Sequence, residues 1–89
     1  SMLAMILRTC DTPVEVAGHT DGRGDAEINL HLSERRAQSV AKHLVRYGVN
    51  PAQIRAKGYG ENQPIADNST DAGQKLNRRI EFRVLGEMA

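Results

Sequence analysis

Residues 26–47, AEINLHLSERRAQSVAKHLVRY, decide the fold of this 89-residue chain. Apolar side chains recur in this stretch at the spacing that lines one face of an α-helix. These residues are Ala37, Val40, Ala41, Leu44 and Val45. Asp25 can cap the first turn, and Gly48 can end the helix in the left-handed conformation. The stretch therefore predicts one long helix whose apolar face packs on a sheet.

The segments around this helix alternate between strand and helix character. Residues 14–18 (VEVAG), 54–58 (IRAKG) and 79–84 (RIEFRV) have the alternation or β-branched content of strands. Residues 3–10 are helix-prone up to the break at Pro13, and residues 71–76 can form a short helix. Strands separated by helices predict the α+β class, as a two-layer α/β sandwich with helices covering one face of the sheet.

The last strand has the clearest alternation in the sequence. Ile80, Phe82 and Val84 are expected to point inward, toward the helix layer. Arg79 is expected on the outward face, where it would be solvated with Glu81. The segment therefore predicts a strand with one buried face and one polar face.

Composition excludes several classes of protein. The chain has room for one domain, with 39% hydrophobic and 26% charged residues. A formal charge of +1 and only two Tyr and one Phe argue against a nucleic-acid partner, despite the pairs Arg35-Arg36 and Arg78-Arg79. No apolar run approaches the roughly 18 residues of a membrane helix. The single Cys10 cannot form an internal disulfide and is expected to be a small buried side chain.

Three polar clusters are expected to converge in the fold: residues 18–21, 29–40 and 77–79. A metal site at His19 and Asp21 is disfavoured, because alternate strand-end residues point apart and no four ligands stand at tight spacing. Ser33 lacks a glycine elbow and an evident base, so we interpret it as a hydroxyl on the helix surface rather than a nucleophile. Neither metal, cofactor nor catalytic residue is predicted.

One run of the helix carries a family resemblance. The pattern Asn29-x-x-Leu32-Ser33-x-x-Arg36-Ala37-x-x-Val40 resembles the signature of the OmpA-like peptidoglycan-binding domain, the family of the OmpA C-terminal domain, Pal and MotB. Residues 14–21, Gly58-Tyr59-Gly60-Glu61 with Pro64, and residues 77–81 resemble the landmarks that surround this signature. The resemblance runs from about residue 3 to residue 85. It implies an OmpA-like fold of βαβαβ type that lacks its first strand.

The resemblance implies a noncatalytic domain that holds peptidoglycan through diaminopimelate, whose free end carries an ammonium and a carboxylate. Matched by position, Asp21 would accept hydrogen bonds from the ammonium, and Arg36 would hold the carboxylate. Four further residues would line the same site: Thr20, Asn29, Leu32 and Arg78. Such a domain would anchor a larger periplasmic or outer-membrane protein to the cell wall.

Elementary electrostatics agrees with one acid and one base. A zwitterion is strongly hydrated, and one buried charge left unpaired costs several kcal/mol. A binding site must therefore supply one acid and one base, the roles that the resemblance gives to Asp21 and Arg36. The start of the helix would add partial positive charge, which favours a ligand carboxylate near Arg36 if the pocket opens toward that end.

Residues 1–2 resemble a remnant of tag removal, residues 3–86 the domain without its N-terminal part, and residues 87–89 a tail. Any membrane contact would belong to other regions of the parent protein. A missing first strand would expose the edge of a neighbouring strand, so a homodimer through that edge is expected as one compensation.

Two other functions stay open. A protein–protein assembly domain of an envelope or stator complex, with weak wall binding, would present an exposed apolar patch away from Asp21 and Arg36. An enzyme acting on peptidoglycan would need a general acid or nucleophile in the pocket, and the sequence offers none.

Overall fold

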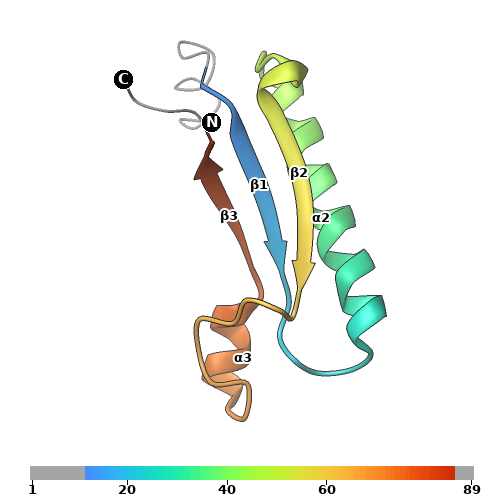
Figure 1. Cartoon of the computed structure of the whole chain (residues 1–89), viewed down its shortest axis with the longest axis vertical. Coiled ribbons are helices and arrows are strands. Elements are labelled where there is room, and N and C mark those ends of the chain that lie inside the picture. Colours follow the sequence, from blue (N-terminus) through green and yellow to red (C-terminus); the bar gives the residue numbers. More distant parts are fainter. Residues whose placement is uncertain (1–11, 86–89) are drawn as a thin grey trace.

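The computed structural model describes residues 12–85 (Figure 1). Its elements, in chain order, are β1 (Val14–His19), α2 (Ala26–Arg46), the 3-10 turn η1 (Pro51–Gln53), β2 (Ile54–Gly60), α3 (Asp71–Asn77) and β3 (Arg79–Val84). Each predicted strand and helix of this part of the chain is confirmed, with ends that move by one or two residues. The helix expected over residues 3–10, with Cys10, lies outside the described residues.

The three strands form one sheet in the order β2-β1-β3. The central strand β1 runs parallel to β2 and antiparallel to β3. A parallel pair needs a long crossover, and α2 supplies it between β1 and β2. Helix α2 lies against β1 and β2, so the molecule has one helical layer and one sheet layer (Figure 1). This arrangement confirms the predicted two-layer sandwich.

Both ends of α2 form as their residues predict. The Asp25 carboxylate accepts hydrogen bonds from the backbone N–H groups of Glu27 and Ile28, at 2.8 and 3.3 Å. Gly48 follows the helix with φ 95°, a left-handed conformation in which other residues would be strained. Local chemistry therefore marks both ends of this helix.

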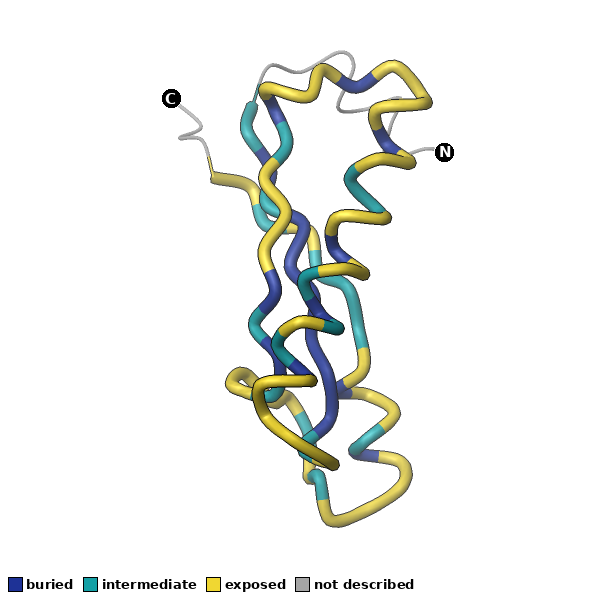
Figure 2. The backbone as a smooth tube through the Cα atoms, turned by 90° about the vertical axis from the view of Figure 1, so that its right-hand side faces the viewer, coloured by how far each residue is buried: buried dark blue, intermediate teal, exposed yellow. Residues whose placement is uncertain are grey.

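A small apolar core joins α2 to the sheet. Ala37 and Leu44 pack with Val14, Val16 and Val49, and all five are at most 2% exposed. Figure 2 shows the buried residues following β1 and the side of α2 that faces it. Val45, predicted to share this apolar face, is instead 37% exposed and lines an open groove between α2 and β2.

The first half of α2 sits unusually close to the strands. A Cβ atom built on Gly18 would collide with the backbone carbonyl of Ser33, and one on Gly58 would collide with the backbone of Glu34. Glycine at these two strand positions lets the helix backbone rest directly on the sheet. The ends of β1 and β2 are thereby fixed against the start of α2.

The burial predicted for β3 is wrong in part. Ile80, Phe82 and Val84 do lie on the helix side, because they pair with Gly18, Val16 and Val14 of β1. Phe82 is nevertheless 43% exposed and Val84 64% exposed. Helix α2 covers β1 and β2 but does not cover β3 (Figure 1). The alternation correctly predicted which side chains of β3 point toward the helix layer. It did not predict whether a helix covers them.

Arg79 also departs from its prediction as a solvated residue. Its side chain lies on the face of the sheet opposite α2, yet it is only 14% exposed. The guanidinium pairs with Glu81 and donates hydrogen bonds to the carbonyl oxygens of Asn77 and Gln63. These contacts hold the Arg79 side chain against the sheet instead of leaving it in solvent.

Candidate functional site

Strand β1 delivers Thr20 and Asp21 into a tightly held loop. The backbone N–H of Thr20 donates to the Gly60 carbonyl at 2.9 Å, which continues the pairing with β2 beyond the end of β1. The Thr20 hydroxyl donates to the carbonyl oxygen of Asp21, also at 2.9 Å. Both residues are buried. The backbone thus fixes where the Asp21 carboxylate stands.

Two arginines surround the Asp21 carboxylate. Arg78, at the end of α3, donates to Oδ2 at 2.7 Å. Arg23 donates its backbone N–H to Oδ1 at 3.0 Å and its guanidinium to Oδ2 at 3.3 Å. The hydrogen bond from the Arg23 backbone, followed by that from Arg78, lowers the pKa of Asp21. The carboxylate is therefore ionised and acts as an acceptor.

Asn29 connects this loop to the helix and to the end of β2. Its side-chain amide donates to the carbonyl oxygen of Arg23 at 2.8 Å and to that of Asp21 at 3.5 Å. It also donates to the Glu61 carboxylate at 3.3 Å. The structure thus brings Asp21, Asn29 and Arg78 together from three separate parts of the chain.

Ser33 has a structural role that the sequence interpretation missed. It is fully buried, not a surface hydroxyl. Its Oγ donates to the Leu30 carbonyl at 2.8 Å and accepts from the backbone N–H of Gly60 at 2.9 Å. Because Gly60 in turn accepts from Thr20, Ser33 connects α2 to the loop that carries Asp21. The glycines at positions 18 and 58, which leave room for the helix, are the sequence signal for this contact.

Arg36 and Leu32 lie further along the same helix. Leu32 is half-buried, and Arg36 is exposed, with no hydrogen bond or ion pair to any residue from 12 to 85. Arg36 follows Asn29 by seven residues, so it stands on the same side of α2, about 10 Å along the helix axis. Its guanidinium is free to meet a ligand.

The start of α2 is poorly placed to add positive charge at Arg36. Asp25 already accepts from the first free N–H groups of α2. Arg36 stands almost three turns beyond Ala26, whereas the dipole effect falls off within about one turn. Any ligand carboxylate near Arg36 would therefore depend on side-chain charge alone.

Sequence reasoning also missed Arg23 and Glu61, which contact Asp21 and Asn29. Both stand in turns next to predicted strands, and only the folded arrangement of those turns brings them to the site. Arg23 and Arg78 both contact the Asp21 carboxylate, and Glu61 adds a second carboxylate beside Asn29. With the exposed Arg36 on the same helix, the arrangement offers both charge signs to a ligand.

His19 lies on the opposite face of the sheet from α2. Its ring stacks on Tyr59 with centroids 5.4 Å apart, and its Nε2 stands 3.8 Å from the Glu81 carboxylate. Burial, followed by the charge of Arg79, lowers the pKa of His19.

Across residues 12–85, no three His, Cys, Asp or Glu side chains lie close enough together to hold a metal ion. Nor does that part of the chain contain a helix with the length and apolar character for crossing a membrane.

Comparisons with known proteins agree on one family. The sequence model described as the OmpA family matches residues 2–78. Outer membrane porin F of Pseudomonas fluorescens is 55% identical over 73 residues, which are 82% of this chain and 22% of the porin. The peptidoglycan-associated lipoprotein of Pseudomonas putida is 44% identical over 70 residues, 79% of this chain and 42% of the lipoprotein. The chain therefore spans less than half the length of these relatives.

A solved structure extends the likeness to three dimensions. The crystal structure of the peptidoglycan-associated lipoprotein from Burkholderia pseudomallei has a TM-score of 0.88 to this chain at 32% identity. The match covers 92% of this chain and 70% of that one.

Proposed function

Because the chain belongs to the OmpA family, we propose that it binds peptidoglycan noncovalently and anchors a larger envelope protein to the cell wall. Two of the relatives are named peptidoglycan-associated lipoproteins, and one is an outer membrane porin. The periplasmic location predicted for this chain agrees with the location of these relatives. The function is binding, with no chemical step.

The ligand group is the zwitterionic end of diaminopimelate, and the ionised Asp21 carboxylate carries the proposal. A carboxylate offers about four acceptor positions. Three N–H groups of Arg23 and Arg78 occupy part of this capacity, which leaves room for one ammonium donor. The Arg23 guanidinium makes the longest of these contacts, 3.3 Å, and its side chain is 65% exposed. It is therefore the group that an incoming ammonium would displace, because an exposed ion pair contributes less than about 1 kcal/mol.

Arg36 supplies the opposite charge. Its guanidinium can hold a carboxylate through two parallel donors, a geometry that lysine lacks. Arg78, 38% exposed in its side chain, offers a second cation to the stem peptide. Thr20, Asn29 and Leu32 would line the site between these charges, mainly by fixing the loop and the helix around the ligand.

The test is calorimetric titration of the chain with a diaminopimelate-containing muropeptide. Asp21→Asn and Arg36→Gln should each weaken binding at least tenfold, about 1.4 kcal/mol. Arg35→Gln is the matched control, because it removes an exposed arginine one position away on the same helix. Circular dichroism should show all three variants folded. Equal affinities of the three variants would refute the assignment of Asp21 and Arg36.

The same experiment separates binding from catalysis. Intact sacculi incubated with the chain should retain it in the pellet and release no soluble fragments. Release of muropeptides would favour an enzyme instead.

The predicted assembly role is the second candidate, and one observation favours it. Val45 and Ile54 border an apolar groove at the far end of α2 from Asp25. This surface is separate from Asp21 and Arg36, as an assembly domain would require. A homodimer through a sheet edge also stays a proposal: a clean monomer in light scattering at high concentration would remove it.

A further inference from the structure

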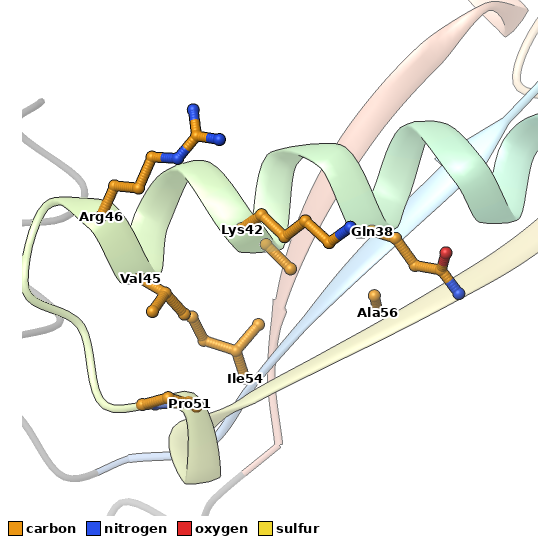
Figure 3. Close-up of a pocket in the computed structure, with 8 residues that line it drawn as sticks. Gln38, Lys42, Val45, Arg46, Pro51, Ile54 and Ala56 are labelled. Atoms are coloured by element: carbon orange, nitrogen blue, oxygen red, sulfur yellow. The ribbon is translucent and has the colours of Figure 1, made fainter.

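The second half of α2 and the start of β2 enclose a groove of about 480 Å³ (Figure 3). Its apolar lining comes from both elements and from η1: Ala41, Val45, Pro51, Ile54 and Ala56. Figure 3 shows Val45 and Ile54 facing one another across the groove, from the helix and from the strand. Apolar side chains left accessible in a concave surface are typical of a binding groove.

The backbone beside the groove is also available for pairing. Strand β2 lies at the edge of the sheet and pairs only with β1 among residues 12–85 (Figure 1). The outer edge of a strand presents N–H and C=O groups to which another strand can add. An added strand would project every second side chain toward the groove, because side chains alternate between the two faces.

The charges at the groove have one sign. Lys42 and Arg46 line it from the helix, and no acidic side chain is among its lining residues. We propose that this groove binds an acidic, extended segment of a partner protein, which adds as a strand to the outer edge of β2. Its apolar side chains enter between Val45 and Ile54, and its carboxylates meet Lys42 and Arg46.

A flat anionic membrane fits these features less well. Lipid head groups cannot pair with the edge of β2, and a concave apolar surface does not insert into a bilayer as a convex one does. The groove lies along the second half of α2, whereas Asp21 precedes the first turn, and neither Asp21 nor Arg36 is among the groove's lining residues. The partner and the cell wall would therefore use different side chains.

The probe is a capped nine-residue peptide of alternating glutamate and valine, with a lysine–valine peptide of the same length as its counterpart. In NMR titrations of the isotope-labelled chain at millimolar peptide, the acidic peptide should shift the amide signals of Ala41, Val45 and Ile54. The lysine peptide should leave them in place. The Asp21→Asn variant should bind the acidic peptide as the unmodified chain does, which keeps this test independent of wall binding.

Charge reversal gives the decisive comparison. Lys42→Glu should weaken binding of the acidic peptide at least fivefold, whereas Lys75→Glu, the same change at an exposed position of α3, should leave it unchanged. Equal effects of the two variants, or equal binding of both peptides, would overturn the proposal. The proposal would also be overturned if the chain sedimented with phosphatidylglycerol vesicles in a Lys42-dependent way and did not bind the acidic peptide. Self-association through the same amides without peptide would overturn it as well.

Discussion

Replacing Ser33 by alanine should loosen the connection between α2 and the loop that carries Asp21. The substitution removes the only side-chain oxygen that accepts from the Gly60 N–H in the described part of the chain. Ser33 is fully buried, so water has little access to the orphaned group. The backbone link from Thr20 to Gly60 would then depend on strand pairing alone.

The magnitude follows from this unsatisfied donor. A buried N–H left without a partner costs about 1 to 3 kcal/mol. Alanine recovers about 0.5 kcal/mol through its higher helix propensity. The free energy of unfolding should therefore fall by about 0.5 to 2.5 kcal/mol, which lowers the Tm of a domain of this size by about 2 to 20 °C.

Urea unfolding followed by circular dichroism measures this change, and hydrogen exchange at the Gly60 amide locates it. Ser39→Ala is the matched control, since Ser39 lies exposed on the same helix. It should leave stability unchanged or raise it slightly. If Ser33→Ala proved as stable as Ser39→Ala, with the Gly60 amide still protected, the structural role assigned to Ser33 would be refuted.

Three further changes test other parts of the fold. Gly18→Ala should cost about 1 to 3 kcal/mol in urea unfolding, because its Cβ meets the backbone of α2. Gly22→Ala should cost less, because its Cβ meets the end of the Asn68 side chain, 2.9 Å away, and no backbone atom. Asn77→Ala removes four hydrogen bonds from a fully buried side chain and should cost about 2 to 3 kcal/mol in the same assay; a smaller loss than for Gly22→Ala would contradict this. Folding lowers the pKa of His19, so the unfolded chain binds more protons and stability should fall as pH drops below about 6.5. His19→Gln should reduce this pH dependence; an unchanged slope between pH 7.5 and 5 would exclude His19 as its source.

The parts of the fold set by local chemistry were predictable from sequence. Asp25 and Gly48 mark the ends of α2 because capping depends on one side chain or one backbone conformation. The alternation in residues 79–84 gives the strand and its two faces. In such places a few neighbouring residues are enough to predict the local structure.

The parts that depend on packing between distant segments were not predictable in the same way. Ser33 is buried because Gly18 and Gly58, on two different strands, let the helix backbone approach. Phe82 is exposed because α2 crosses over the other two strands. The sequence pattern is silent on both arrangements.

The candidate site shows the same division. The family resemblance indicated Asp21 and Arg36, and spacing along the helix placed Asn29 and Arg36 on one side. The resemblance also placed Arg78 at this site, but its direct ion pair with Asp21, 57 residues earlier, depends on α3, which returns the chain to the end of β1. Arg23 joins them through the shape of a turn that composition does not specify.

The central claim is that Asp21 and Arg36 hold the two charges of one amino acid end. A crystal structure of the chain with meso-diaminopimelate tests this most directly. The ligand ammonium should lie within about 3 Å of the Asp21 carboxylate, and a ligand carboxylate should face the Arg36 guanidinium through two hydrogen bonds. A ligand bound elsewhere, or one that touches Asp21 while Arg36 remains in solvent, would contradict the claim.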